Sequence, residues 1–384
     1  MTTRLRVALD ALPLQVRSAG VAAYVRELTR ALAALDAPPE LQLFGLSWPA
    51  PPPHDAEGRA WPGGVNVVAS PRYPLVMGAP VAALPRLVDC AAVLGAIDVF
   101  HATAYAVPRA RHTPVVLTVH DLTLLRAPEL GTPALCRSVR RAAALVGEAR
   151  LVIADSEATR RDLLAFTGVR AESTRVVPLG VGGAFRPQPP EAARAHVAAH
   201  LGVADRFLLH VGTLEPRKNL PFLIDACARL WRDGRLTHRL VLAGAPGWGA
   251  AAVTEAIERH AAERFVIRLG QVAAADLPIL YAAADGVVVP SRDEGFGLSL
   301  LEGMACGTPV VAADAGALPE VAGDAALVVD PAEADAWADA IARVLADQDL
   351  AARLRSAGPA RAAQFTWARC ARETLAVYEE AVRT

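Results

Sequence analysis

Lys218 stands beside Arg217 and is the only lysine in a chain whose lysines and arginines together number 39. The pair lies in a loop that opens with Gly212, directly after an apolar run at 207–211 that is typical of a buried strand. A compact ammonium and a forked guanidinium can bind one phosphate group together. The two residues therefore indicate a phosphate site, and the alternative is an exposed basic pair at the start of a helix.

A second loop carries glycines and acids at a strand-to-helix turn. Glu294 is followed by Gly-Phe-Gly at 295–297, and a helix is expected from 298 to about 306. Glycine lets the backbone approach a ligand closely, and the unpaired amides at a helix start attract anions. Glu302, one turn inside that helix, could accept hydrogen bonds from a ribose diol, and Glu294 could reach another hydroxylated group. The alternative is a solvated helix acid at Glu302 and a helix-stabilising role for Glu294.

Histidines follow two other expected strands. His120 comes directly after the apolar run 114–119, which favours a position in a ligand-binding cleft. The alternative is a structural histidine paired with Asp121. His101, Thr103 and Tyr105 lie near the end of another run and are candidates for acceptor contacts. Ser156 is expected to cap a helix over 157–166.

These segments are positioned by short apolar runs that alternate with longer patterns of helical spacing. The runs lack polar alternation, which is typical of parallel strands buried on both faces. They predict an α/β protein with two doubly wound sheets, and a proline-rich boundary near 187–190. The expected strands are 4–9, 41–45, 66–69, 99–102, 114–119, 151–154, 175–177, 207–211, 240–243, 265–269, 286–289, 310–312 and 326–329.

Composition and missing motifs exclude several classes of protein. The 384 residues have a net charge of −1, with a surplus of +4 over residues 1–185 and a deficit of −5 over the remainder. Five scattered cysteines without a C-x-x-C pair argue against a disulfide scaffold or a zinc site. No apolar run approaches a membrane span of roughly 18–20 residues, and the first residues do not resemble a signal peptide. The first expected strand lacks a following G-x-G-x-x-G, and Lys218 lacks the P-loop pattern.

Together the motifs resemble the retaining glycosyltransferase family 4, which has the GT-B fold. The resemblance is carried by residues 212–219 and by the seven residues that separate Glu294 from Glu302. Further matching runs lie at 119–122, 154–156, 177–181, 307–311 and 319–325. The resemblance implies two Rossmann-like doubly wound parallel-sheet domains that face a cleft. Residues 1–186 would form the acceptor-binding domain, with a closing helix at 367–384 packed back on it, and 187–366 the nucleotide-sugar-binding domain.

The resemblance also implies roles for individual residues. Arg217 and Lys218 would bind the donor diphosphate, Glu302 the ribose hydroxyls and Glu294 the donor sugar. His120 would point at the transferred sugar. The remaining donor contacts would be Gly20 in a loop that closes over the phosphates, Gly212, Val272 beside the nucleobase, and Phe296, Gly297 and Leu298 near the donor sugar. Around Gly20 the chain departs from the family, which commonly shows paired glycines and then a basic residue before tyrosine.

The expected reaction is transfer of a hexose with retention of anomeric configuration. No D-x-D motif suits a metal, so Arg217 and Lys218 would replace a divalent ion at the leaving diphosphate, and no metal or cofactor is expected. Residues 212–219 are similar to those of bacterial mannosyltransferases, which favours GDP-mannose over UDP-sugars as donor. The acceptor would be a glycan or a lipid-linked molecule, and no nucleic acid is expected as a partner. A noncatalytic nucleotide-sugar-binding protein and an epimerase or phosphorylase of the same fold are the other candidates.

A basic, alanine-rich stretch in the first half offers a surface for an anionic partner. Its arginines are Arg137, Arg140, Arg141 and Arg150. They could approach anionic lipid headgroups, and the alternative is a solvated basic helix. Because the sequence shows neither a signal peptide nor a membrane span, we expect a cytoplasmic protein. The basic stretch adds the hypothesis of peripheral contact at the inner membrane face.

Overall fold

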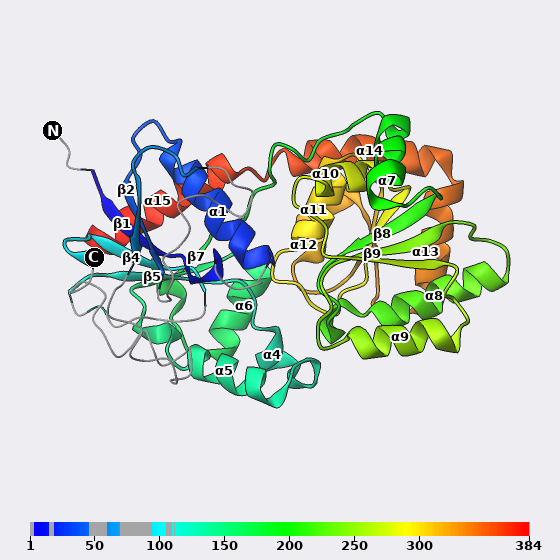
Figure 1. Ribbon diagram of the computed structural model, residues 1–384. Helices are drawn as coiled ribbons and strands as arrows, with labels where there is room; N and C mark the ends of the chain where they lie inside the picture. The colour runs from blue at the N-terminus through cyan, green and yellow to red at the C-terminus, as the bar shows by residue number, and fades with distance from the viewer. Residues whose placement is uncertain are drawn as a thin grey trace. The chain divides into compact units, whose positions relative to one another are not determined.

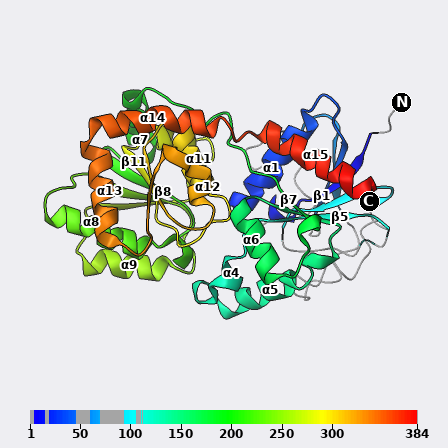
Figure 2. The same cartoon turned by 180° about the vertical axis from the view of Figure 1, so that it is seen from behind.

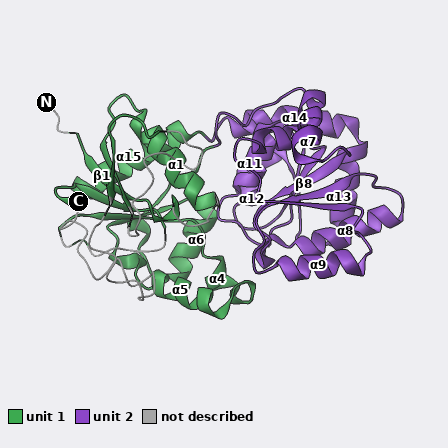
Figure 3. Ribbon diagram, viewed as in Figure 1, with its two compact units in different colours: residues 1–180, 366–384 green, residues 181–365 purple. Residues whose placement is uncertain are grey.

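The computed structural model describes residues 4–14, 19–45, 60–69, 94–104, 110 and 112–383. These residues form two compact units (Figure 3): residues 1–180 with 366–384, and residues 181–365. The division falls between Gly180 and Val181, a few residues before the prolines at 187–190. Each unit is built on one parallel sheet.

Unit 1 contains a seven-stranded parallel sheet in the order β3-β2-β1-β4-β5-β6-β7 (Figure 1). The order reverses between β1 and β4, which makes this pair the switch point of the sheet. The strands are β1 (Arg6–Asp10), β2 (Glu40–Gly45), β3 (Val65–Ala69), β4 (Val99–Ala102), β5 (Val115–Val119), β6 (Leu151–Ala154) and β7 (Thr174–Val176). The helices include α1 (Ala19–Ala33), α4 (Thr123–Arg126), α5 (Pro133–Ala143), α6 (Glu157–Phe166) and α15 (Trp367–Arg383).

Unit 2 contains a six-stranded parallel sheet in the order β10-β9-β8-β11-β12-β13, which reverses between β8 and β11. The strands are β8 (Phe207–Val211), β9 (Arg239–Ala243), β10 (Val266–Gly270), β11 (Gly286–Val289), β12 (Val310–Ala313) and β13 (Leu327–Val329). The helices are α7 (Pro190–Leu201), α8 (Leu220–Arg232), α9 (Ala250–Arg259), α10 (Leu277–Ala283), α11 (Leu298–Ala305), α12 (Leu318–Ala322), α13 (Ala334–Ala346) and α14 (Gln348–Ala362). Figure 1 shows them on both sides of the sheet.

The central strands are short because they cross a core that is covered on both faces. Every residue of β4, β5, β6, β11 and β12 is buried, and most are β-branched or small. Such residues fit the pleated surface of a buried strand. All thirteen expected strands are present with ends shifted by two residues at most. The predicted fold class, two Rossmann-like parallel sheets, is confirmed.

Helix α15 follows unit 2 in the chain and completes unit 1. Thr366 begins it, accepting a hydrogen bond from the Arg369 amide at 3.1 Å, as expected of an N-cap. The helix lies beside α1 (Figure 2) and contacts β4 and β5. A Cβ atom on Gly180 would lie 2.2 Å from the Trp367 nitrogen, so only glycine allows this backbone contact. Among the described helices, none is long and apolar enough to span a membrane.

Candidate functional site

The candidate donor site lies at the carboxyl ends of β8 and β11, the two strands at which the order of the unit 2 sheet reverses. In open parallel sheets this edge is where ligands bind, because the loops diverge there and leave a crevice. The loop after β8 carries Arg217 and Lys218, and the loop after β11 carries Glu294. The Arg292 amide donates to the Arg217 carbonyl at 2.9 Å and joins the two loops.

Local backbone geometry fixes the first loop. Residues Pro216–Lys218 form a single 3₁₀ turn, which Asn219 ends in the left-handed region at a φ of 56°. Asparagine tolerates this conformation better than most residues. The Asn219 side-chain oxygen accepts from Arg292 Nε at 3.1 Å, so the turn is held from the second loop. Lys218 is thereby placed at the inner side of the turn, where it is 9% exposed.

Gly297 and Gly316 shape the second loop. Gly297 has a φ of 95° at the N-cap of α11, and a Cβ there would lie 2.6 Å from Leu318 Cδ2. Gly316 has a φ of 56°, and a Cβ there would lie 2.3 Å from the Glu294 carbonyl oxygen. Both positions therefore require glycine. They let residues 316–318, which follow β12, pack closely against Glu294 and the start of α11.

The Glu294 carboxylate joins the two loops. Its Oε1 accepts from Lys218 Nζ at 2.6 Å and from the Ser291 hydroxyl at 2.7 Å. Its Oε2 accepts from Arg217 Nη1 at 2.6 Å. Arg217 also donates to the Asp293 carbonyl at 2.9 Å and to Glu215 at 2.8 Å. The structure thus brings together Arg217, Lys218 and Glu294, as expected from the sequence, and adds Ser291.

The electrostatics of this cluster favour the charged form of Glu294. Burial alone would raise the pKa of this carboxyl, but the charges of Arg217 and Lys218 outweigh burial and hold its pKa far below the ordinary value. Arg217 is also paired with Glu215, so two cations and two carboxylates meet in this cluster. Arg217 and Lys218 are the groups of the cluster that suit a diphosphate.

Glu302 lies on α11 beside Tyr281 of α10. The Tyr281 hydroxyl donates to Glu302 Oε2 at 2.8 Å, and the ring of Phe185 packs edge-on against Tyr281. Burial raises the pKa of Glu302 to about 7, against which the Tyr281 hydrogen bond acts in the opposite direction. Glu302 therefore titrates near neutral pH, where a small change in surroundings alters its charge.

The other expected donor contacts in unit 2 differ in what they can offer a ligand. Val272 follows β10 and is half-buried. The Phe296 ring is 5% exposed and packs edge-on against Phe365. Phe296 can therefore contact a ligand only through its backbone. Gly297 and Leu298 stand at the cap and first residue of α11, where amides lack intrahelical partners.

His120 ends β5 in unit 1 and has both ring nitrogens bonded. Nδ1 lies 2.6 Å from Asp155 Oδ2, and Nε2 lies 2.9 Å from the Thr103 carbonyl oxygen. The Thr103 carbonyl only accepts, so Nε2 carries a hydrogen, and an ionised Asp155 favours a second hydrogen on Nδ1 and with it the charged ring. Burial lowers the pKa of His120, but Asp155 and the Thr103 carbonyl raise it by more. The carboxylate bonded to Nδ1 is Asp155, where the structural alternative expected Asp121.

His101 and Thr103 are buried and bonded within unit 1, so the prediction that they contact an acceptor is wrong in this structure. His101 Nδ1 lies 2.5 Å from the Tyr378 hydroxyl of α15, and Nε2 lies 2.8 Å from Thr118 Oγ1. Burial lowers the pKa of His101 to about 3, so the ring is neutral. Thr103 Oγ1 donates to the Asp10 carbonyl at 2.6 Å. Tyr105 lies outside the described residues.

The sequence predicted that Gly20 lies in a loop. In the structure Gly20 is instead the second residue of α1. It is exposed, and a Cβ there would meet no atom within 4 Å. The residues just before α1, 15–18, lie outside the described part of the chain. The structure therefore gives no steric reason for glycine at this position.

Sequence reasoning missed three residues of these clusters: Ser291, His210 and Asp155. Ser291 precedes Glu294 by three residues, a spacing that lets its hydroxyl reach back to the carboxylate. His210 is a lone polar residue in the otherwise apolar strand β8, and that contrast was a usable signal. Asp155 belonged to the matching run 154–156 but was assigned no partner.

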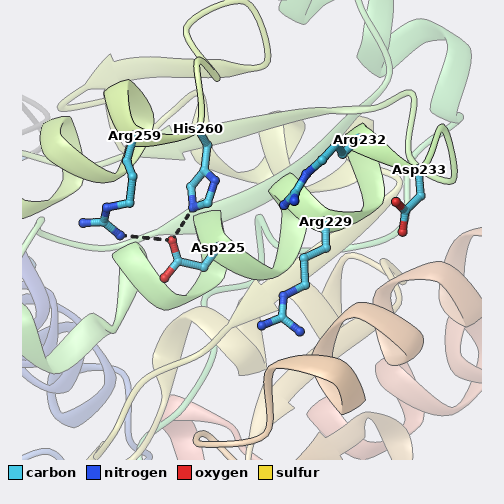
Figure 4. Close-up of a pocket in the computed structure, with 6 residues that line it drawn as sticks. All are labelled: Asp225, Arg229, Arg232, Asp233, Arg259 and His260. Carbon is cyan, nitrogen blue, oxygen red and sulfur yellow. Dashed lines mark hydrogen bonds and ion pairs between the residues drawn. The ribbon is translucent and has the colours of Figure 1, made fainter.

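An open pocket of about 600 Å³ lies elsewhere in unit 2, along α8 and α9 (Figure 4). It is lined by Asp225, Arg229, Arg232, Asp233, Arg259 and His260. Arg259 and His260 pair with Asp225, and Arg229 pairs with Asp335. The ends of α8 and α9 that form it lie toward the amino ends of the strands, away from Lys218. In the part of the chain that the structure describes, no group of three His, Cys, Asp or Glu side chains is placed to hold a metal ion.

Comparisons with known proteins agree with this geometry. The family model for Glycosyltransferase Family 4 matches residues 18–182, and that for Glycosyl transferases group 1 matches residues 196–361. The chain is 30% identical to the O-antigen chain mannosyltransferase B of Escherichia coli, over 96% of this chain and 97% of the relative. It is 33% identical to the D-inositol 3-phosphate glycosyltransferase of Segniliparus rotundus, over 70% of this chain and 62% of the relative.

Solved structures resemble the whole chain. A sucrose-phosphate synthase from Thermosynechococcus elongatus has a TM-score of 0.75 and 23% identity, covering 98% of this chain and 99% of its own. Anabaena HepE, solved in complex with UDP-glucose, has a TM-score of 0.73 and 25% identity, covering 97% of this chain and 100% of its own.

Proposed function

The chain belongs to glycosyltransferase family 4, and from this premise we propose that it transfers a hexose, mannose by preference, from GDP-mannose to a glycan or lipid-linked acceptor. The mannosyltransferase relative, which aligns over nearly the full length of both chains, supports this donor. The sequence of residues 212–219, which is similar to that of bacterial mannosyltransferases, supports it as well. A UDP-sugar is the second candidate, favoured by the likeness to HepE, which was solved with UDP-glucose.

The observation that carries the proposal is the cluster of Arg217, Lys218 and Glu294 at the switch point of unit 2. Glu294 holds both cations together at the edge where a parallel sheet binds ligands. In our proposal Arg217 and Lys218 bind the donor diphosphate, and Glu294 then turns one oxygen to a hydroxyl of the donor sugar. Gly212 lets the diphosphate approach the backbone of the same loop.

The chemical step breaks the bond between the anomeric carbon and the diphosphate oxygen. Negative charge grows on that oxygen and positive charge on the sugar ring. Fixed cations at the growing negative charge lower the barrier, because they need no reorganisation during the reaction. We propose that Arg217 and Lys218 do this without a metal ion or cofactor. A test is to measure transfer in EDTA and in excess Mg²⁺; a requirement for the metal would contradict the metal-free part of the proposal.

Retention of configuration follows, in our proposal, from attack on the face that the diphosphate leaves. The acceptor hydroxyl forms the new bond to the anomeric carbon, and its proton passes to the departing phosphate oxygen. No enzyme nucleophile is then needed. The anomeric configuration of the product, read by NMR, tests this: inversion would contradict it.

The nucleoside part of the donor is assigned to α11 and the loop after β10. Glu302, when ionised, accepts hydrogen bonds from the ribose diol. Val272 contacts the base, and the amides of Phe296, Gly297 and Leu298 contact the donor near its sugar. In unit 1, His120 contributes a fixed positive charge, since neither ring nitrogen is free to bond a sugar hydroxyl. Gly20 remains a proposed donor contact through the backbone of the first turn of α1.

The partner surface proposed for unit 1 is the exposed side of α5. Arg137, Arg140 and Arg141 are exposed there at helical spacing, and none has a carboxylate partner among the described residues. Thr132 caps the helix, and Cys136 and Ala143 anchor it to the core. Arginines without counterions attract anionic headgroups by about 1 kcal/mol each. We propose that this side meets an anionic membrane surface at the inner face, where a lipid-linked acceptor would be found.

Vesicle sedimentation tests the partner surface. The protein should bind vesicles that contain phosphatidylglycerol at low salt and not pure phosphatidylcholine vesicles. Replacing Arg137, Arg140 and Arg141 with glutamine should abolish binding. The matched control replaces Arg232, Arg353 and Arg355, three exposed arginines of unit 2. Equal loss in both variants, or no retention of the wild type, would remove the membrane from the proposal.

A donor screen tests the central proposal. Only a true ligand raises the melting temperature by mass action, so thermal shifts with GDP, UDP and ADP identify the base. Transfer assays with the matching sugar nucleotides should release the nucleoside diphosphate and leave a glycosylated acceptor. Binding without turnover would favour a noncatalytic protein. An epimerised sugar or a sugar phosphate as product would favour the other enzyme classes of this fold.

A further inference from the structure

His210 lies on β8, one residue before the carboxyl end of the strand, and has one ring nitrogen bonded and one not. It is 1% exposed. Its Nδ1 lies 3.0 Å from the Val288 carbonyl oxygen of β11, whereas Nε2 is buried and has no hydrogen-bond partner among the described residues. A buried polar atom without a partner costs free energy, so such atoms are rare and often functional.

The bonded nitrogen explains why a histidine stands here. The ladder between β8 and β11 pairs Leu208 with Gly286 and Leu209 with Val287, and His210 is the next residue of β8. On its other side β8 stays paired with β9 through Val211. The His210 side chain bonds a β11 carbonyl just where the two strands separate and the crevice begins.

The protonation of His210 follows from this bond. Because the Val288 carbonyl can only accept, Nδ1 carries the hydrogen, and the neutral ring has its lone pair on Nε2. Burial, followed by the charge of Lys218, lowers the pKa of His210 to about 4, so the ring is neutral at neutral pH. Nε2 is therefore an acceptor that lacks a donor.

A donor stands close by. A Cβ atom on Gly212 would lie 3.2 Å from His210 Nε2 and 3.1 Å from Lys218 Cε, so a single methyl group would touch both side chains. The Lys218 ammonium has three hydrogens, of which Glu294 Oε1 takes one. Glycine at 212 leaves the space between the two side chains open.

We propose that His210 is a positioning residue for Lys218, whose ammonium donates to His210 Nε2 when a nucleoside diphosphate draws it from Glu294. This rests on the proposed function, because it requires a diphosphate at the cluster. The ammonium then stays bonded to His210 Nε2 while its other two hydrogens bond phosphate oxygens. Holding a charged group in place before the reaction is worth more than adding a mobile one.

Two substitutions separate the two ring nitrogens. In His210→Asn the side-chain amide can still donate to Val288, as Nδ1 does, but nothing reaches the position of Nε2. In His210→Gln the longer side chain brings an amide oxygen to the position of Nε2 and gives up the bond to Val288. His260→Asn, which removes a ring bonded to Asp225 on the α8–α9 side, is the matched control.

The experiment measures the dissociation constants of GDP and UDP by calorimetry, the donor KM and kcat, and the melting temperature of each variant. We expect His210→Asn to melt near the wild type and to bind the preferred diphosphate about tenfold more weakly, the size of one charged hydrogen bond. The donor KM should rise by the same factor. His210→Gln should melt lower but bind within about threefold of the wild type. His260→Asn should match the wild type in melting temperature and in affinity for the diphosphate.

If His210 had a purely structural role, the variant with the lower melting temperature would also bind the diphosphate more weakly. The Nε2 contact is identified if His210→Asn melts higher than His210→Gln but binds the diphosphate more weakly. The inference is overturned if both variants bind like the wild type, if both lose affinity equally, or if only His210→Gln loses it. If wild-type protein binds neither GDP nor UDP, the proposed function itself fails, and the inference falls with it.

Discussion

The two sheets are bridged in the same way where their strand order reverses, but the chemistry around the bridges is opposite. In unit 1, Thr103 at the end of β4 donates to the Asp10 carbonyl at the end of β1. In unit 2, His210 of β8 donates to the Val288 carbonyl of β11. Each bridge satisfies a carbonyl where two strands part. The difference lies in what surrounds it.

In unit 1 all four ring nitrogens of the two histidines near the bridge are bonded within the unit. His101 bonds Thr118 and Tyr378, and His120 bonds Asp155 and a backbone carbonyl. In unit 2 two cations share Glu294, and His210 Nε2 is buried without a partner among the described residues. A polar residue at the carboxyl end of a strand is thus a weak sign of function by itself. Whether its atoms are already used decides the matter.

Lys218→Ala is the strongest way to break this comparison. If the cations of unit 2 bind the leaving diphosphate, transfer should slow about a hundredfold, which corresponds to about 3 kcal/mol of lost transition-state stabilisation. Steady-state kinetics with the preferred donor measure it. Arg232→Ala, on the far end of α8, is the control and should keep its rate. Near-normal turnover of a folded Lys218→Ala protein would remove Lys218 from the mechanism.

Glu294→Gln tests whether the carboxylate holds the cations of unit 2. The substitution keeps the shape but leaves Arg217 and Lys218 without their shared counterion, so the free energy of unfolding should fall by about 3 kcal/mol. Because the folded pKa lies below the unfolded value, the contribution of Glu294 is complete above the unfolded pKa and is lost as pH falls toward the folded one. Urea unfolding at pH 7.5 and pH 3.5 measures both effects. The same unfolding free energy in wild type and variant at neutral pH would contradict this account.

Glu302 gives unit 2 a pH dependence near neutrality, and Asp10, whose pKa burial raises to about 6, gives unit 1 another. The pKa of Glu302 is raised to about 7 in the folded state, so between the unfolded value and 7 the folded protein binds the extra proton. The free energy of unfolding should therefore decrease by about 2 kcal/mol as pH rises through that range. Glu302→Gln should reduce that slope, and the part due to Asp10 should remain. A wild-type slope of the opposite sign, or one that is unchanged in the variant, would show that other groups set it.

Tyr378→Phe probes the internally bonded edge of unit 1 and should have the smallest effect. It removes the hydroxyl beside His101 Nδ1 without changing packing, and should cost about 1 kcal/mol of unfolding free energy. Transfer kinetics should stay within twofold of the wild type. Calorimetric unfolding combined with kinetics separates the two. A loss of rate comparable to that of Lys218→Ala would mean that unit 1 contributes to chemistry through this network.

The fold was predictable because buried parallel strands leave a simple signature. Runs such as Val115–Val119 and Gly286–Val289 are apolar without alternation, and this pattern depends only on burial of both faces. Motif spacing identified Arg217, Lys218 and Glu294 individually as site residues. It could not show that Glu294 binds both cations, because Glu294 is 77 residues from Arg217 and 76 from Lys218.

The histidines show the limit more clearly. His101 and His120 both follow apolar runs, and sequence patterns treat them alike. His101 is buried because Tyr378, 277 residues away, returns to it on α15. The pKa of His120 is raised because β6 brings Asp155 alongside. Gly20 was expected in a loop because the family resemblance implied one there, whereas the structure places it in the first turn of α1.

Helix α15 has a consequence for how the protein is made. It buries Trp367, Cys370 and Tyr378 in unit 1, although the ribosome synthesises them after the whole of unit 2. Domains generally fold as units from the N-terminal end during translation. Here the second unit has its full complement of residues first, because unit 1 lacks these three buried side chains until α15 has been made.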